Sequence, residues 1–308
     1  MSLIVAEDLA KSYGRVIAVD GLDLRVDKDS VTGLIGPNGA GKTTTIKMIL
    51  GLLRPDRGHV TVFGQDPWDN TEIRSLIGVV YEKASFPSHQ KTLDYLERVS
   101  RVFGVPESRA MDVLELVNLH EASDRPIKAL SAGMLQKFAI AHALIHEPEL
   151  VIADEMTANL DPQARSELLD LILRLHNNEH VAFLLSSHIL PELSRVCDAM
   201  TIINQGKVWA SGTLSELYER YAVGIMRIST NNPEELALEI KKLPYIEKLV
   251  IDLRGISVRV ADGMEDKVYE DTTKLARKRK VKLLGIETGS ASLEELYQLV
   301  IRSNERGG

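Results

Sequence analysis

Apolar and polar positions follow two different patterns along the first two thirds of the chain. Short and fully apolar runs occur at Val31–Ile35, Leu150–Ala153 and Val181–Leu185, and each has the length and composition of a buried parallel strand. Between them lie segments with the spacing of amphipathic helices, such as Thr43–Leu50 and Arg165–His176. Strands that alternate with helices in this way predict an α/β fold with a mostly parallel sheet.

One stretch departs from this alternation. Residues 90–120 and 131–146 have helical patterns with no strand between them, and the first is interrupted by Gly104-Val105-Pro106. These segments predict a helical subdomain, at about residues 86–146, that is inserted into the α/β core.

The final part of the chain differs in pattern and in charge. From residue 221 onward the apolar segments follow the order βαββαβ plus a terminal helix, typical of a ferredoxin-like α+β domain, and Asn232-Pro233 is suited to open its first helix. Residues 221–308 hold 15 basic and 14 acidic residues, whereas the whole chain holds 37 and 44. The excess of acidic residues therefore lies in the first part. We expect two domains, residues 1–220 and 221–308.

Composition limits the classes of function. The 308 residues carry a net charge of −7, which disfavours a nucleic-acid binder that relies on a basic surface. Cys197 is the single cysteine, so an internal disulfide and a zinc site built from cysteines are excluded, and a reducing compartment fits. No apolar run reaches the length of about 18 residues that spans a membrane, and the acidic residues after the short apolar start disfavour a signal peptide.

A glycine-rich segment lies between a predicted strand and a predicted helix. It has the pattern of a phosphate-binding loop, Gly36-Pro37-Asn38-Gly39-Ala40-Gly41-Lys42-Thr43, followed by Thr44. Glycines let backbone N–H groups surround phosphates, Lys42 supplies a positive charge for the β- and γ-phosphates, and Thr43 supplies a hydroxyl for Mg²⁺. We expect this loop to bind ATP with Mg²⁺ as the cofactor.

Two carboxylates follow the apolar strand Leu150–Ala153. Asp154 stands at the strand end, where it can hold the Mg²⁺ shell, and Glu155 is placed to polarise a water for attack on the γ-phosphorus. Paired acids at a strand end are often only the start of a solvated loop. Because a phosphate-binding loop precedes them in the chain, a second nucleotide motif is the better interpretation, with Glu155 as the catalytic residue of an ATPase.

The segment Leu130-Ser131-Ala132-Gly133-Met134 precedes a long helical stretch. Ser131 is suited to cap this helix and Gly133 permits close approach, so the helix start is either a second anion site or simply a capped helix without a ligand. With the two preceding motifs, the segment resembles the signature loop of the ATP-binding subunits of ABC transporters, whose usual form is Leu-Ser-Gly-Gly-Gln. The resemblance covers residues 1–220 and implies a P-loop NTPase core of the RecA-like type.

Further residues stand where this family has functional ones. Tyr13 resembles the aromatic residue that stacks on adenine, although a core tyrosine is the alternative. Asp161 lies in a segment that resembles the loop communicating across the family's dimer. His188 follows a core strand and resembles the switch histidine that contacts the γ-phosphate, although an isolated histidine is more often structural. Glu82 stands where the family commonly has a glutamine, which implies a charged contact to Mg²⁺ or to the attacking water.

Several positions depart from the usual family pattern. Ala132 replaces the first signature glycine, Met134 replaces the terminal glutamine, and Met156 replaces the proline after the catalytic glutamate. Together with Glu82 and the C-terminal domain, these departures resemble the ATPase subunits of ABC-2-type exporters, the group related to the daunorubicin-resistance ATPase. The resemblance implies a homodimer in which each Mg-ATP lies between one phosphate-binding loop and the partner's Ser131–Met134, with the C-terminal domain as an accessory to the dimer.

The resemblance also implies a function and a place in the cell. ATP hydrolysis would power export through a separate transmembrane permease, with the chain in the cytoplasm as a peripheral subunit on the inner face of the cell membrane and with no nucleic-acid partner. A non-transport ABC ATPase that acts as a mechanical switch is the alternative. It predicts a second phosphate-binding loop, a long coiled coil or a cysteine-bound metal site, which the sequence lacks. A regulatory binder with negligible turnover predicts loss of Glu155 or His188, and both are present.

Overall fold

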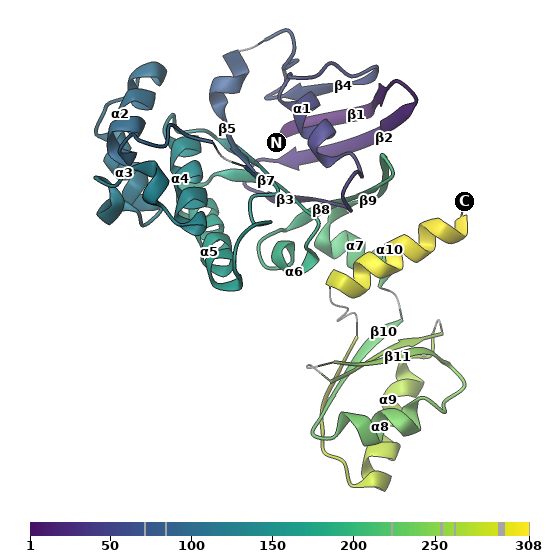
Figure 1. Cartoon of the computed structure of the whole chain (residues 1–308). Coiled ribbons are helices and arrows are strands. Elements are labelled where there is room, and N and C mark those ends of the chain that lie inside the picture. The colour runs from purple at the N-terminus through teal and green to yellow at the C-terminus, as the bar shows by residue number, and fades with distance from the viewer. Residues whose placement is uncertain are drawn as a thin grey trace. The chain divides into compact units, whose positions relative to one another are not determined.

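The chain forms two compact units, Met1–Gly212 and Thr213–Gly308, which are described separately (Figure 1). The computed structural model describes residues 1–70, 72–83, 85–222, 224–252, 255–261, 263–288 and 293–307. The expected boundary at residue 220 falls in helix α7 (Leu214–Tyr221), whereas the structure divides the chain before this helix. The reason is that α7 packs against α10 (Leu293–Gly307) of the second unit.

Two sheets build the first unit. The larger has the order β5-β6-β7-β3-β8-β9 and the smaller has the order β2-β1-β4. The strands are β1 (Ser2–Tyr13), β2 (Val16–Asp27), β3 (Val31–Ile35), β4 (Arg57–Val62), β5 (Ile77–Tyr81), β6 (Leu150–Asp154), β7 (Ala182–Ser187), β8 (Ala199–Asn204) and β9 (Lys207–Thr213). The pairs β5–β6, β6–β7, β7–β3 and β3–β8 are parallel, which confirms the predicted sheet. The small sheet is antiparallel and was not predicted.

The α-helices described in the first unit are α1 (Lys42–Ile49), α2 (Thr92–Phe103), α3 (Arg109–Leu116), α4 (Ala132–Leu144), α5 (Pro162–Glu179) and the short α6 (Leu190–Leu193). Helix α1 contacts strands of both sheets and buries Ile46, Met48 and Ile49 between them. Helices α2, α3 and α4 pack on one another in the expected region of the helical subdomain (Figure 1). Gly104 ends α2 in a left-handed conformation, as the break in the sequence pattern indicated.

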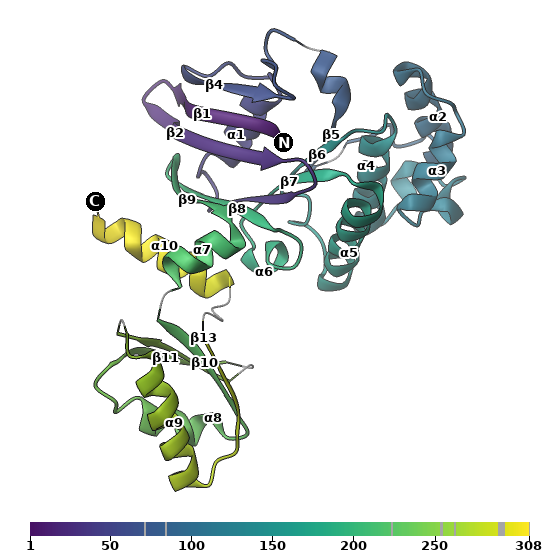
Figure 2. The same cartoon turned by 180° about the vertical axis from the view of Figure 1, so that it is seen from behind.

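The second unit has the strand order β11-β12-β10-β13, and every neighbouring pair is antiparallel. Its strands are β10 (Ile225–Thr230), β11 (Ile246–Asp252), β12 (Gly255–Val260) and β13 (Leu283–Thr288), and its sheet helices are α8 (Pro233–Ile240) and α9 (Glu265–Arg279). Figure 2 shows α8 and α9 on one face of this sheet. Asn232 caps α8 by accepting a hydrogen bond from the Glu235 N–H, and Pro233 is its first residue. The arrangement agrees with the expected ferredoxin-like α+β fold.

No helix among the described residues is long and apolar enough to cross a membrane.

Candidate functional site

Three central strands end at the same edge of the large sheet. Strands β6, β7 and β3 are adjacent and parallel, and all of their residues are buried. In their register, Ile35 lies opposite Ser187 and Asp154 lies opposite Ser186. The segments that follow these strands therefore start side by side, as at the carboxyl edge of other open α/β sheets. They are the phosphate-binding loop, the Asp154-Glu155 pair and the segment of His188.

A cavity of about 500 Å³ lies at this edge. Ten of the predicted site residues line it: Tyr13, Asn38, Gly39, Gly41, Lys42, Thr43, Thr44, Glu82, Glu155 and His188. Gly36, Pro37 and Ala40 complete the loop without lining the cavity. Val16, Ile17 and Ala18 also line it and were not predicted from the sequence. Ala158, at the start of the predicted dimer loop that contains Asp161, lines it as well.

One wall of the cavity is apolar and comes from the small sheet. Tyr13 ends β1, and Val16 and Ile17 begin β2. These three side chains are 51 %, 66 % and 59 % exposed, so Tyr13 is not a core tyrosine. An exposed ring beside two aliphatic side chains offers a flat apolar surface of the kind that a nucleobase covers.

The phosphate-binding loop is packed so closely that glycine is required at two of its positions. A Cβ on Gly36 would lie 2.2 Å from the Ile203 carbonyl oxygen. At Gly41, φ is 109° and a Cβ would lie 2.5 Å from the Ala18 carbonyl oxygen. Helix α1 begins directly after Gly41, and within residues 41–49 no side chain caps it and no acidic residue occupies its first turn. Its first N–H groups are thus left for an anion.

Lys42 is held across the loop. Its side chain is buried, and Nζ donates to the carbonyl oxygens of Gly36, at 2.7 Å, and Pro37, at 3.2 Å. The same Nζ lies 3.0 Å from Glu155 Oε1. The ammonium group is therefore fixed between the phosphate-binding loop and the acidic pair.

Asp154 and Thr43 bring two oxygen atoms together. Thr43 Oγ1 donates to Asp154 Oδ2 at 2.8 Å, and the Ser186 hydroxyl donates to Asp154 Oδ1. Neighbouring carboxylate and hydroxyl oxygens are the ligand type that Mg²⁺ prefers. Among the described residues no group of three His, Cys, Asp or Glu side chains is arranged to hold a metal ion. This donor set suits a cation that takes its remaining ligands from phosphates and water.

Glu155 has a strained backbone that is fixed by hydrogen bonds. Its φ is 51°, a left-handed conformation that is uncommon for a residue with a side chain. Its N–H donates to the backbone oxygen of Ser186 at 3.2 Å and to the Ser186 hydroxyl at 3.1 Å. On the side chain, Oε2 accepts a hydrogen bond from His188 Nδ1 at 2.6 Å. Lys42, Glu155 and His188 thus form one connected group at the cavity.

Glu82 connects the cavity to the helical subdomain. It follows β5, and its backbone oxygen accepts a hydrogen bond from Gln136 Nε2 of α4 at 3.0 Å. Its side-chain Oε1 accepts from Asn159 Nδ2 at 3.3 Å. Since Asn159 belongs to the loop after Glu155, Glu82 contacts both α4 and that loop.

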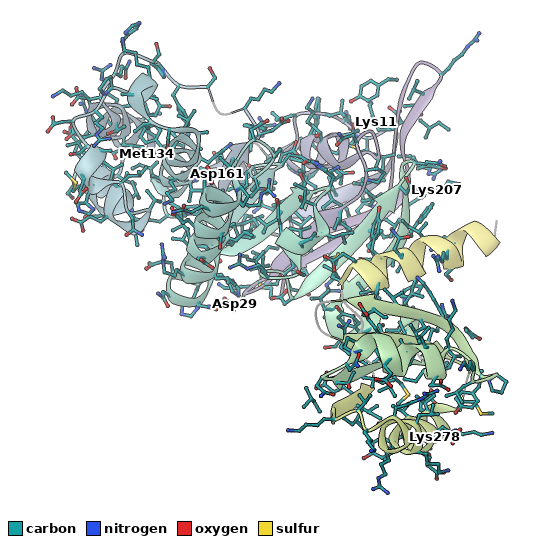
Figure 3. All side chains as sticks on the ribbon, turned by 60° about the horizontal axis from the view of Figure 1, so that its bottom comes forward. Lys11, Asp29, Met134, Asp161, Lys207 and Lys278 are labelled. Carbon is teal, nitrogen blue, oxygen red and sulfur yellow. The ribbon has the colours of Figure 1, made fainter. Side chains whose placement is uncertain are left out.

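The signature segment and Asp161 do not line the cavity. Ser131 caps α4 by accepting from the Met134 N–H at 3.3 Å, and Ser131 and Ala132 are exposed. Asp161 caps α5 by accepting from the N–H groups of Gln163 and Ala164, each at 3.0 Å. Met134 and Asp161, which mark the starts of α4 and α5, are labelled in Figure 3. Gly133 faces α5, where a Cβ would lie 2.9 Å from that of Ala164.

A buried carboxylate near the site was not predicted from the sequence. The Glu192 side chain is 4 % exposed, and Oε1 lies 2.7 Å from Arg165 Nε. Its Oε2 accepts hydrogen bonds from the hydroxyls of Thr157 and, at 3.4 Å, Ser187. Thr157 follows Glu155 by two residues and Ser187 precedes His188. Glu192 therefore links the segments that carry Glu155 and His188 to Arg165 at the start of α5. No local motif marks Glu192, because its partners come from three separate segments.

We expect Glu192→Gln to lower the free energy of unfolding by about 2 kcal/mol, because a charge-assisted buried contact is lost while Arg165 keeps its charge. Urea denaturation of the two proteins measures this difference. Glu149→Gln is the matched control, since the ion pair of Glu149 with Lys28 is half exposed and should contribute little. Equal losses in the two variants would contradict a special role of the buried pair.

Comparison with known proteins agrees with this geometry. Residues 19–158 match the family model described as ABC transporter. The linearmycin resistance ATP-binding protein LnrL of Bacillus subtilis is 32% identical over 96% of this chain and 97% of its own. The daunorubicin/doxorubicin resistance ATP-binding protein DrrA of Streptomyces peucetius is 31% identical over 96% of this chain and 91% of its own.

A solved structure agrees as well. A structure described as the ATP-binding subunit of an ABC transporter is 31% identical in sequence to this chain and superposes with a TM-score of 0.62. The match covers 71% of this chain and 93% of that one. These similarities support a transporter ATPase and not the non-transport alternative. With the P-loop fold, the cavity at its strand ends and relatives matched over nearly their whole length, the chain belongs to the ATP-binding proteins of ABC transporters.

Proposed function

We propose that this chain hydrolyses ATP to drive export through a separate transmembrane permease, as in the ABC-2-type group. The observation that carries the proposal is the connected group of Lys42, Glu155 and His188 at a cavity bounded by the phosphate-binding loop. The two full-length relatives are named for resistance to linearmycin and to daunorubicin and doxorubicin. A transporter ATPase that confers resistance does so by driving a compound out of the cell, which supports export for this chain. A permease would hold it at the inner face of the membrane.

We infer that ATP lies along the cavity with adenine on the apolar wall of Tyr13, Val16 and Ile17. The phosphates then reach the loop N–H groups and Lys42. Mg²⁺ would be held by Thr43 and Asp154, with Glu82 close by, and when bound it neutralises charge on the β- and γ-phosphates.

Hydrolysis requires a change of partner at Lys42. The ammonium contacts Glu155 Oε1 at 3.0 Å, and a γ-phosphate would compete for it. Once Lys42 pairs with phosphate, Glu155 Oε1 is free to accept a proton from an attacking water. His188 Nδ1 holds the other carboxylate oxygen, and its ring can then reach the γ-phosphate from the same side.

We infer that the second half of each site comes from another copy of the chain. Ser131 and Ala132 are exposed at the start of α4 and lie outside the cavity, yet the helix start is suited to an anion. Head-to-tail closure of two copies would bring Ser131–Met134 onto the partner's nucleotide, with Asp161 in the neighbouring loop. Motion of the two copies would be passed to the permease.

Mixing two inactive variants tests the shared site. Ser131→Arg should abolish activity because its bulk blocks the start of α4, and Lys42→Ala should be inactive for a separate reason. A mixed dimer retains one site assembled from intact halves, so the mixture should regain ATPase activity that neither protein shows alone. Measured phosphate release gives the result.

Ser215→Arg, a change at an exposed serine of α7, is the matched control and should remain active. A mixture as inactive as its parents would count against a shared site, provided that a mixture of wild-type and Lys42→Ala protein shows that one working site is sufficient.

A further inference from the structure

The second unit contains a cleft of about 600 Å³ that the ATPase mechanism does not use. Four cationic side chains from four different elements line it: Arg220 of α7, Lys248 of β11, Arg259 of β12 and Arg302 of α10. Among the described lining residues, Glu247 is the only acid. The lining of the cleft therefore carries an excess of positive charge in a chain whose net charge is −7.

Two of these cations face each other directly across neighbouring strands. Lys248 and Arg259 are partners in the antiparallel register of β11 and β12. Val258 and Val260, on either side of Arg259, are buried in the core of the unit, so Arg259 projects from the opposite face of the sheet. Like charges in directly opposed positions destabilise a sheet. A negatively charged ligand at this point would relieve the repulsion.

The acidic residues nearby offset it only in part. Glu247 Oε2 lies 3.4 Å from Arg259 Nε in an exposed pair, and Glu216 precedes Arg220 by about one turn of α7. Neither Lys248 nor Arg302 forms an ion pair with an acidic side chain of the described residues. Glu294 and Glu295 line a smaller adjoining cavity of about 190 Å³ together with Lys248, Arg259 and Arg302. Glu295 is paired with Arg227.

We propose that this cleft is a binding site for a compact anion with two or more negative charges, of the phosphate ester or oligophosphate class. Arg259, Arg220 and Arg302 each present a planar fork of donors that matches phosphate oxygens, and Lys248 adds a point charge. The volume is that of a typical small-molecule site. A bound anion relieves the Lys248–Arg259 repulsion and joins α7 and α10 to the sheet within the second unit.

The other basic cluster of this unit has a different explanation. Arg277, Lys278, Arg279 and Lys280 lie in or just after the last turn of α9, with Lys278 labelled in Figure 3. Cations at a helix C-terminus are favoured by the helix dipole, and Arg279 is paired with Glu239. No cavity is lined by these side chains among those described above, so the cluster provides a control with the same charge.

Titration with inorganic pyrophosphate tests the site. The full chain carries Lys42→Ala in every sample, to weaken the phosphate-binding loop, and Mg²⁺ is omitted. We expect Lys248→Gln/Arg259→Gln to weaken pyrophosphate binding by about tenfold or more in calorimetry at low salt, because charge-assisted hydrogen bonds are lost. The control Lys278→Gln/Lys280→Gln should bind as the parent does. Equal binding by both double variants, or none by either, overturns the proposal.

Two further measurements keep the test decisive. Citrate that binds the cleft as tightly as pyrophosphate would overturn the phosphate class. Without an anion, Lys248→Gln should raise the midpoint of thermal unfolding of the second unit, because the charge that opposes Arg259 is removed. With saturating pyrophosphate, the parent should have the higher midpoint of the two proteins. If the midpoint of Lys248→Gln is lower than that of the parent both with and without pyrophosphate, Lys248 is stabilised by other contacts. That result would overturn the proposal.

Discussion

Glu155→Gln should lower the rate of ATP hydrolysis by about 10²-fold or more while ATP binding is retained, since general acid–base assistance has at least this value. The amide keeps the size of the side chain but loses its charge and basicity. Lys42 also loses an anionic partner at 3.0 Å, which leaves its ammonium more available to phosphate. With ATP bound and not cleaved, the closed dimer should accumulate. Size-exclusion chromatography with and without ATP measures the shift from monomer to dimer.

Two variants control this experiment. Asp154→Asn should weaken Mg²⁺ and nucleotide binding together and give no ATP-dependent dimer, because it removes a charged oxygen beside Thr43. Glu149→Gln changes an exposed glutamate that directly precedes β6, whereas Glu155 directly follows this strand. This variant should hydrolyse ATP normally. Near-normal turnover by Glu155→Gln would place the base elsewhere, with Glu82 and His188 as the next candidates.

Lys42→Ala should abolish hydrolysis and raise the dissociation constant of ATP by about 10²-fold, the effect of losing one to two strong charge-assisted hydrogen bonds to the phosphates. The fold should persist, because α1 is anchored by Ile46, Met48 and Ile49 between the two sheets. Titration with a fluorescent ATP analogue measures the affinity, and circular dichroism reports the fold.

Lys47→Ala is the matched control in the same helix, since Lys47 is exposed one turn further along α1. It should bind and hydrolyse ATP as the parent does. Unchanged hydrolysis by Lys42→Ala would remove the phosphate-binding loop from the site.

The elements that could be predicted are those specified by consecutive residues. Apolar runs such as Val31–Ile35 and Leu150–Ala153 define strands by themselves, and the loop that follows each of them carries its chemistry in adjacent positions. The N-cap of α8 at Asn232 was likewise predictable, because the residue and its partner Glu235 lie within one helical turn. The carboxyl ends of parallel strands meet at one edge of the sheet, which explains why Lys42 and Glu155 lie together in the structure.

The features that could not be predicted depend on contacts between distant segments. Strands β1 and β2 run for 12 residues each with several shifts of register, so they show no clean alternation, and β4 joins them from far along the chain. The apolar wall of Val16 and Ile17 follows from this sheet and was missed with it. Glu192 has the sequence context of an ordinary surface glutamate, and the opposition of Lys248 and Arg259 depends on a register that no local pattern encodes.

The packing around Gly41 separates two kinds of evolutionary constraint within one loop. A side chain there would strike the Ala18 carbonyl oxygen at 2.5 Å, whatever the site binds. The Ala40 carbonyl oxygen also accepts a hydrogen bond from Gly206, which in turn accepts one from Asp20. A descendant copy that no longer split ATP would therefore still need Gly41 to fold, whereas Lys42 and Glu155 would be free to drift. In such copies, substitution of Lys42 and Glu155 would indicate that ATPase activity has been lost. Retention of Gly41 would not indicate that the activity remains.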